Sequence, residues 1–483
     1  MSHDDHHDHS MCGCCHSIGR RDFMISVGAS ALAAHSALRA VGAQDSLVAP
    51  AAEKPRVRAV FLRPKVDQYW MGWPGASYDI HARQADYTKI MTDAAGALGV
   101  ELEATQEPLA DRAAIEALLA ECRDKPPLGV ILVAMSLNHS WPDIDFFVSQ
   151  KGNLPTIVFS PMGTSFTGHL AGTRNKPRTY VAATQQLDWL ATGVRLLWTI
   201  WAMRNSRLLI VNGDKTEDKV LDVIGTTLHY IPLDRWTDEL SKIGTTDEMR
   251  RLAEEFAKTA QKTVEPNADD VLNSARAYFV AKKLMADEGC DGISLNCLGL
   301  VGSRRIPCPP CMAWLRLNDE GSVGCCECDW NAAISLRLTS YLCGRPGFMQ
   351  DPCPNTVNGT LMGAHCSSPM RLRGFDQPAE PLILRSHSES NIGVSPQVIW
   401  PLGEPATVMK FEGPSRMILG TGKVVANIET PPAGGCRTSV ELAMDNVADP
   451  RDCKGFHQLF VLGRLDGLYR AYAALAGIEV VPI

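Results

Sequence analysis

The segment 325–331, CCECDWN, combines three thiols with two carboxylates. Two pairs of cysteine thiolates on tight turns can hold zinc in a tetrahedral site, and CPPC at 308–311 supplies one such pair upstream. The second pair is CCxC rather than CxxC, and the intervening residues 314–324, WLRLNDEGSVG, are expected to form a strand and a turn. A zinc or iron–sulfur site is one interpretation, and buried thiols or a disulfide are the other.

The two carboxylates of this segment are predicted to have different roles. Asp329 directly precedes the helical run 330–342, so its side chain is expected to cap that helix by accepting a backbone N–H of the first turn. Glu327 lies on the loop that leads into the helix, where a side chain can project into a cleft. A further carboxylate, Asp351, follows the turn CGRPGFMQ. Glu327 and Asp351 are therefore the candidate pair for acid–base chemistry or metal binding.

The whole segment 310–351, PCMAWLRLNDEGSVGCCECDWNAAISLRLTSYLCGRPGFMQD, resembles the active-site segment of the L-fucose isomerase and L-arabinose isomerase superfamily. In that family a Leu-Asn-Asp-Glu-Gly turn is followed by Cys-Glu-x-Asp, a helix and a second acidic residue. The resemblance puts Glu327 on the first metal-binding carboxylate and Asp351 on the Asp ligand of the fucose isomerases. Arabinose isomerases instead carry Glu-Asp after Phe-Met, and Gln350 stands at that Glu position here. The resemblance therefore implies a fucose-type site.

Two histidines extend the resemblance. His365, in LMGAHCSS, falls where arabinose isomerases carry a metal-binding His, and His457, in FHQLFVLG, falls near the late ligand histidine of the superfamily. The implied metal ligands are Glu327, Asp351 and His457, with His365 as a fourth candidate. The resemblance is clearest over residues 290–370, extends to the C-terminal end and is weak over the first part of the chain.

The resemblance implies a metal-dependent aldose–ketose isomerase, and the chemistry of these residues is compatible with that activity. Such an enzyme moves a proton between adjacent carbons of a monosaccharide through an enediol, and a divalent cation polarises the carbonyl as a Lewis acid. Two carboxylates and one imidazole are hard ligands that suit Mn²⁺. A positioned base contributes roughly 10² to 10⁴ in rate, so Glu327 and Asp351 are assigned jointly to metal binding and proton transfer. The resemblance also implies a homo-oligomer.

Two other functions would use the same residues. A related sugar epimerase or lyase would share the enediolate-forming step. A non-catalytic carbohydrate-binding protein on the same fold is the second alternative, although both carboxylates and His457 are present. The sequence leaves the identity of the sugar open.

Elements that alternate between β-branched runs and helices are expected to position these residues. RVRAVFL at 56–62, LGVILVAM at 128–135 and LPTIVFS at 154–160 predict strands with helices between them, and the pattern begins again with RLLIVNGD at 207–214. Two Rossmann-like α/β domains with parallel sheets are therefore predicted, over 44–175 and 176–350. Short alternating runs after residue 350 predict a C-terminal antiparallel β-barrel-like domain over 351–483. The resemblance implies the same order.

The first 43 residues are predicted to be a twin-arginine export signal rather than part of the fold. RRDFM at 20–24 resembles the twin-arginine motif, an apolar run too short to span a bilayer follows, and VGA at 41–43 offers a cleavage site. The mature protein is therefore expected in the periplasm or elsewhere outside the cytoplasm, without a membrane span. An ordinary N-terminal tail with a chance Arg pair is the alternative.

Composition limits the other partners. The chain has 483 residues, enough for two or three domains, and a formal net charge of −7. It therefore lacks the basic balance of a nucleic-acid-binding protein, and no nucleic-acid partner is expected. Thirteen of the sixteen cysteines follow the predicted signal, and an odd number cannot pair completely within one chain.

Overall fold

The computed structural model of the chain describes residues 54–71, 76–137, 139–429 and 435–483. The predicted export signal at 1–43 and its cleavage site lie outside these residues. None of the helices formed by the described residues combines the length and the apolar character that a membrane crossing requires.

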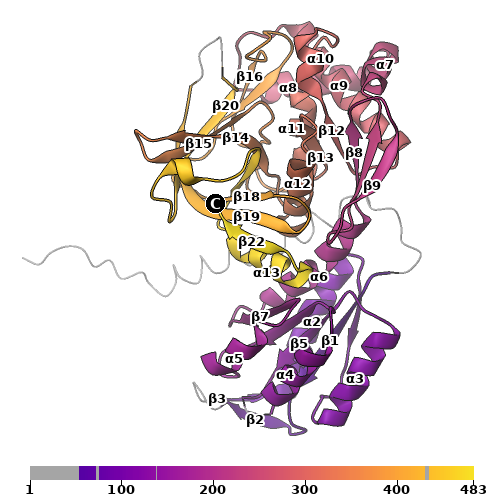
Figure 1. Cartoon of the computed structure of the whole chain (residues 1–483), viewed down its shortest axis with the longest axis vertical. Coiled ribbons are helices and arrows are strands. Elements are labelled where there is room, and N and C mark those ends of the chain that lie inside the picture. Colours follow the sequence, from indigo (N-terminus) through magenta and orange to yellow (C-terminus); the bar gives the residue numbers. More distant parts are fainter. Residues whose placement is uncertain (1–53, 72–75, 138, 430–434) are drawn as a thin grey trace, which may run out of the picture.

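A parallel sheet of five strands, in the order β4-β1-β5-β6-β7, forms the first α/β unit (Figure 1). Its strands are β1 (Arg56–Leu62), β4 (Glu101–Ala104), β5 (Gly129–Ala134), β6 (Thr156–Ser160) and β7 (Thr179–Ala183). Its helices are α2 (Ile80–Ala97), α3 (Arg112–Asp124), α4 (Trp141–Gln150), α5 (Thr167–Thr173) and α6 (Trp189–Asn205), and a hairpin of β2 (Gln68–Met71) and β3 (Ala76–Asp79) precedes α2. Since β7 completes the sheet, this unit continues past the expected boundary at residue 175.

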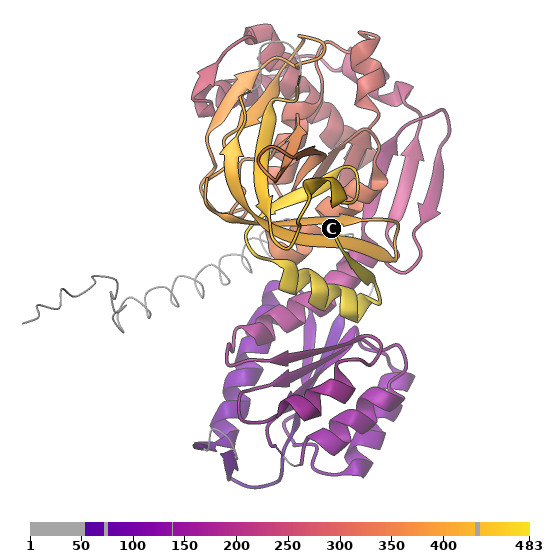
Figure 2. The same cartoon turned by 60° about the vertical axis from the view of Figure 1, so that its left-hand side comes forward.

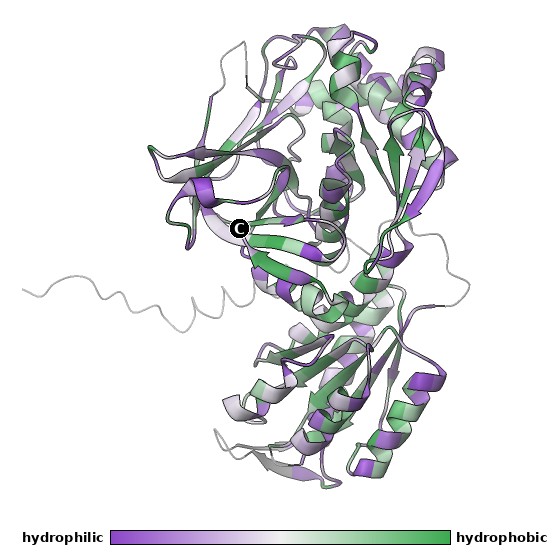
Figure 3. Ribbon diagram, viewed as in Figure 1, coloured by the Kyte–Doolittle hydropathy of each residue, from purple (hydrophilic) through white to green (hydrophobic). Residues whose placement is uncertain are grey.

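Both faces of this sheet are covered by helices, so its central strands are buried throughout. Alternate residues of a strand point to opposite faces. Phe61 and Val133 accordingly share a core with helices α2 and α6, whereas Val60 and Leu132 share a core with α3 and α4. The central strands of the sheets are coloured mainly as hydrophobic in Figure 3.

A second sheet, in the order β13-β12-β8-β10-β9, forms the second α/β unit. Its strands are β8 (Arg207–Val211), β9 (Glu217–Val220), β10 (Thr227–Ile231), β12 (Gly292–Leu295) and β13 (Val323–Cys326). All neighbouring pairs are parallel except β9 with β10. The helices are α7 (Asp234–Lys242), α8 (Asp247–Thr259), α9 (Ala268–Asp287), α10 (Cys297–Gly302), α11 (Cys311–Asp319) and α12 (Trp330–Cys343).

The prediction of a strand within residues 314–324 is wrong for most of that segment. Residues up to Asp319 belong to helix α11, and only Val323–Cys326 form a strand. Helix α11 is buried on nearly every side, including Trp314 and Leu317. A short apolar run that is buried all round has no polar face to reveal its period, so sequence alone cannot distinguish helix from strand there.

Six antiparallel strands close into a C-terminal barrel, in the order β18-β21-β14-β15-β20-β19 with β19 returning to β18 (Figures 1 and 2). They are β14 (Phe348–Asn355), β15 (Thr360–His365), β18 (Pro405–Phe411), β19 (Arg416–Asn427), β20 (Thr438–Met444) and β21 (Gln458–Leu462). A small sheet of β11 (Lys262–Thr263), β16 (Leu382–Arg385) and β17 (Ser395–Val398) lies beside them. The predicted fold class, α/β with two parallel-sheet units followed by an antiparallel barrel, is confirmed.

The end of the chain returns to the first α/β unit. Helix α13 (Asp466–Ala476) contacts α6 and β7, and the following strand β22 (Glu479–Pro482) pairs with β19 of the barrel. In both views α13 lies between the first α/β unit and the rest of the molecule (Figures 1 and 2). The three parts are therefore joined by packing as well as by the chain.

Candidate metal centre

The four predicted site residues lie where the second sheet meets the barrel. Glu327 directly follows β13, at the carboxyl edge where open α/β sheets bind ligands. Asp351 lies in β14, His365 ends β15, and His457 directly precedes β21. Strand β14 pairs with both β15 and β21, with Asp351 opposite Ala364. The barrel register therefore brings three of the residues to one end, facing the fourth.

The backbone at this junction is strained. Glu327, Cys328 and His457 have φ values of 61°, 56° and 53°, in the left-handed region that non-glycine residues rarely adopt. Each such residue costs about 1–3 kcal/mol, and strain of this kind clusters at functional sites. The two consecutive left-handed residues turn the chain from β13 into α12, so Glu327 sits at the point of reversal.

The two histidines face the same carboxylate. His365 Nε2 lies 3.7 Å from Glu327 Oε1, and His457 Nε2 lies 3.5 Å from Glu327 Oε2. Ligand atoms of one cation stand about 3 to 3.5 Å apart when each lies about 2.1 Å from the ion. Both Nε2 atoms are buried without a hydrogen-bond partner, which is rare for buried polar atoms. Glu327, His365 and His457 could therefore hold a metal ion.

No cysteine belongs to this group, and within the described part of the chain it is the one group of at least three Cys, His, Asp or Glu side chains gathered in this way. All thirteen described cysteines are free. Burial raises the pKa values of the Cys325 and Cys328 thiols. The thiolate cage considered for CPPC and CCEC is not formed.

The ring of His457 is held by a second carboxylate, behind the nitrogen that faces Glu327. Its Nδ1 lies 2.9 Å from Asp329 Oδ2, and because a carboxylate can only accept, Nδ1 carries a proton, which leaves the lone pair of the neutral ring on Nε2. Metal-binding histidines are held by a carboxylate in this way. Lys410 Nζ donates to the same Asp329 oxygen at 2.9 Å, and the other Asp329 oxygen accepts the Ala332 N–H at 3.0 Å as the cap of α12. The predicted cap is confirmed, and Asp329 also orients His457.

The charges of this pair follow from its hydrogen bonds. Burial would raise the pKa of Asp329, but the contacts with His457 and Lys410 outweigh it and lower the pKa to about 2. Burial would likewise lower the pKa of His457, but Asp329 and the neighbouring Asp351 raise it to about 9. A cation binding at Nε2 must therefore displace a proton.

His365 has the opposite arrangement. Its Nδ1 accepts the backbone N–H of Cys366 at 2.9 Å, so the neutral ring carries its proton on Nε2, the nitrogen that faces Glu327. Burial would lower the pKa of His365, but Glu327 raises it. In this tautomer His365 donates a hydrogen bond rather than a lone pair.

Asp351 lies beside His457 but outside the group of three. Its Oδ1 is 3.2 Å from His457 Nε2, yet it is buried and makes no well-aligned hydrogen bond. The adjacent Gln350 points to the other side of β14, where its amide donates to Gln458 at 3.2 Å. Asp351 thus places a carboxylate oxygen at the candidate site beside His457, whereas Gln350 does not reach it.

Sequence reasoning missed Lys410 and the second role of Asp329. Lys410 comes from β18 and also donates to the Phe456 carbonyl, next to His457. No local pattern marks this lysine. The Glu-x-Asp spacing of residues 327 and 329 was the available signal for Asp329, since it places a second carboxylate at the N-cap of α12, two residues after Glu327.

A scan against protein-family models and a search of curated proteins gave no match for this chain. Fold and site together define an α/β protein with a C-terminal antiparallel barrel and a buried carboxylate–histidine group that could hold a metal ion.

Proposed function

We propose that this protein is a metal-dependent aldose–ketose isomerase that acts on a monosaccharide through an enediol. The observation that carries the proposal is the buried Nε2 of His457, which makes no hydrogen bond and lies between the Glu327 and Asp351 carboxylates while Asp329 orients the ring. The resemblance of segment 310–351 to the fucose and arabinose isomerases supports it. On the same resemblance we propose a homo-oligomer, for which light scattering should give a mass above that of one chain.

In this proposal Glu327, Asp351 and His457 hold a divalent cation, with Mn²⁺ as the best match to their hard oxygen and nitrogen atoms. The chemistry that such a cation supplies is Lewis-acid polarisation of the sugar carbonyl. His365 is proposed as a hydrogen-bond donor to a sugar oxygen through Nε2, in place of the metal-binding role considered for it. Asp329 and Lys410 keep the His457 ring in position.

The proton transfer needs no group from outside the protein. One of the two carboxylates, Glu327 or Asp351, removes the proton from the hydroxyl-bearing carbon next to the carbonyl and returns it to the former carbonyl carbon. The proton of the hydroxyl group moves in the same direction, to the oxygen of the former carbonyl, so the hydroxyl-bearing carbon becomes the new carbonyl. Oxidation of one carbon balances reduction of its neighbour, so no external oxidant is required.

The proposal is tested with metal-free protein and a panel of aldoses and ketoses. In D₂O, restoring Mn²⁺ should produce the matching ketose or aldose, and NMR should find solvent deuterium at the former carbonyl carbon to the extent that the proton on the carboxylate exchanges with solvent. Inversion at one carbon without carbonyl transfer would favour an epimerase, and products with fewer carbons would favour a lyase. Saturable sugar binding without turnover would favour the non-catalytic alternative.

The predicted twin-arginine signal gives the choice of metal a physical basis. A site with these ligands prefers Cu²⁺ or Zn²⁺ to Mn²⁺ when all are free. We propose that the protein folds around manganese in the cytoplasm and is then exported with the metal trapped. Metal analysis of protein recovered outside the cytoplasm should find manganese, and stoichiometric zinc with full activity would contradict this.

A further inference from the structure

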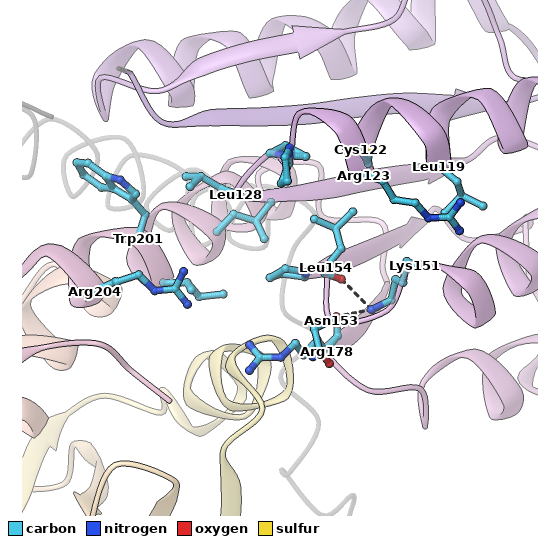
Figure 4. A pocket seen from close by; sticks show the side chains of 15 residues that line it. Leu119, Cys122, Arg123, Leu128, Lys151, Asn153, Leu154, Arg178, Trp201 and Arg204 are labelled. Carbon is cyan, nitrogen blue, oxygen red and sulfur yellow. Dashed lines mark hydrogen bonds between the residues drawn. The ribbon is translucent and has the colours of Figure 1, made fainter. Parts of the chain in front are cut away.

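A cavity of about 560 Å³ lies at the amino edge of the first sheet, away from the candidate metal centre. Its walls come from the loops that lead into β5, β6 and β7, from the end of α3 and from the last turns of α6 (Figure 4). The volume falls within the range of about 300–1,000 Å³ that is typical of small-molecule sites. Nothing proposed for the metal centre uses this cavity.

The cavity is basic. Four of its lining residues are cationic and none is acidic: Arg123, Lys151, Arg178 and Arg204. Within the described part of the chain, none of the four side chains forms an ion pair with a carboxylate. Four cations around one cavity without a counter-charge give a positive potential that favours an anionic ligand.

Lys151 supplies a fixed charge. Its side chain is 7% exposed, and Nζ donates to the carbonyl oxygens of Leu154, Pro177 and Arg178 at 2.8, 2.8 and 3.2 Å. Burial and the nearby Arg178 lower the pKa of Lys151 to about 8. All three N–H groups are used, so Lys151 ties together the loops before β6 and β7 and contributes charge rather than direct contact with a ligand.

Arg178 and Arg204 supply the donors. No hydrogen bond from either guanidinium to a described residue occupies its N–H groups. Arg178 has a left-handed backbone, φ 48°, held by Lys151 and by the Thr156 N–H, which donates to the Arg178 carbonyl at 2.9 Å. Its guanidinium lies beside Gly477, the residue that ends α13. Figure 4 shows Arg178 and Arg204 reaching the pocket from different elements.

The remaining wall is apolar. Leu119, Leu128, Leu154, Leu197 and Trp201 line the cavity between the basic side chains. An inorganic anion would leave this surface in contact with water, whereas an organic anion with an apolar or planar body would cover it. The basic wall and the apolar wall together therefore match a ligand that has a negatively charged end and an apolar end.

We propose that this cavity binds a small organic phosphate with a planar or apolar body. A phosphate monoester carries about −1.5 to −2 charges near neutral pH, and its oxygens match the planar N–H fork of arginine. Arg178 and Arg204 bind the phosphate, Lys151 and Arg123 add positive potential, and Trp201 with the leucines contacts the body. The site is separate from the metal centre and does not depend on the proposed isomerase function.

Calorimetric titration of the full chain with AMP, adenosine and inorganic phosphate tests the proposal. AMP should bind with a dissociation constant below 1 mM, and adenosine and inorganic phosphate should each bind about tenfold or more weakly. Loss of a charge-assisted hydrogen bond weakens binding by about tenfold or more, so Arg178→Gln and Arg204→Gln should each do so. Arg174→Gln is the matched control, because Arg174 is an exposed arginine of the same α/β unit that does not line the cavity.

Equal binding of AMP and adenosine, or no binding of AMP at millimolar concentration, would overturn the proposal. Wild-type affinity in both Arg178→Gln and Arg204→Gln would do the same. Sedimentation of each variant covers the remaining possibility: if the substitutions change the mass of the assembly but not AMP affinity, this face is an interface between copies of the chain. Circular dichroism would identify variants that fail to fold. In that case the affinities of the wild-type protein for AMP and for adenosine decide whether the proposal stands.

Discussion

Strands β15 and β21 each bring one histidine to the Glu327 carboxylate, at nearly equal distances of 3.7 and 3.5 Å. The far nitrogen of each ring has a different partner. Nδ1 of His457 donates to the Asp329 carboxylate, whereas Nδ1 of His365 accepts the Cys366 N–H. Distance to the carboxylate alone therefore does not indicate which ring could bind a metal. The hydrogen-bond partner of Nδ1 fixes the tautomer of the ring and therefore decides whether Nε2 offers a lone pair or an N–H.

The backbone conformations of His365 and His457 also differ. His365 is the last residue of a regular strand, paired with Thr438. His457 has φ 53° and its ring lies against Phe456, with 4.0 Å between ring centroids. A strained residue is retained only where its surroundings hold it, and here Asp329 does so through the ring. The histidine with the strained backbone is therefore also the one that a carboxylate holds in place.

The largest effect is expected when the shared carboxylate is removed. Glu327→Gln should lower Mn²⁺ affinity by more than about 100-fold, since loss of a group that merely orients a ligand already costs about 10- to 100-fold. Titration calorimetry and metal content measure the change. Glu116→Gln, at an exposed position of α3, is the control and should leave both unchanged. If folded Glu327→Gln protein retained the metal, the metal site would have to lie elsewhere in the protein.

The difference proposed between His457 and His365 is tested by replacing each histidine in turn. His457→Asn should lower Mn²⁺ affinity by about 100-fold because it removes the available lone pair. His365→Asn should change affinity by less than about tenfold, because the neutral ring offers an N–H there, but it should reduce turnover. The ratio of the two affinities is the measurement. Equal losses in the two variants would show that the His365 ring changes tautomer and binds the metal as well.

The local sequence predicted individual residues of this site, but it did not predict which side chains contact one another. The Asp329 cap follows from its place before a helical run, and Glu327 from its place on the loop. The pairing of Asp329 with His457 joins residues 128 apart in the chain, and it depends on the barrel register and on Lys410 from another strand. Helix α11 was mistaken for a strand because burial on all sides removed the polar face that would reveal its period. Local patterns report capping and strand periodicity, whereas side-chain partners across sheets need the assembled fold.

A smaller loss separates the two roles of Asp329. Asp329→Asn keeps a good helix cap, because Asn caps about as well as Asp, but it removes the charge that holds the His457 tautomer. Mn²⁺ affinity should fall by about 10- to 100-fold, less than in His457→Asn, while α12 remains folded. Calorimetry and far-ultraviolet circular dichroism measure the two properties. Unchanged affinity would mean that His457 is oriented by its backbone alone.

The smallest effect concerns the proton on His457. Its pKa is raised to about 9 in the metal-free protein, so below that pH a cation must displace a proton from the ring. The Mn²⁺ affinity should therefore rise by about tenfold between pH 6.5 and 7.5, with close to one proton released per ion, as measured by calorimetry in buffers of different ionisation enthalpy. The same slope should persist in His365→Asn if His457 is the source of that proton. A slope that disappears in His365→Asn would assign the proton to His365 and reverse the roles of the two rings.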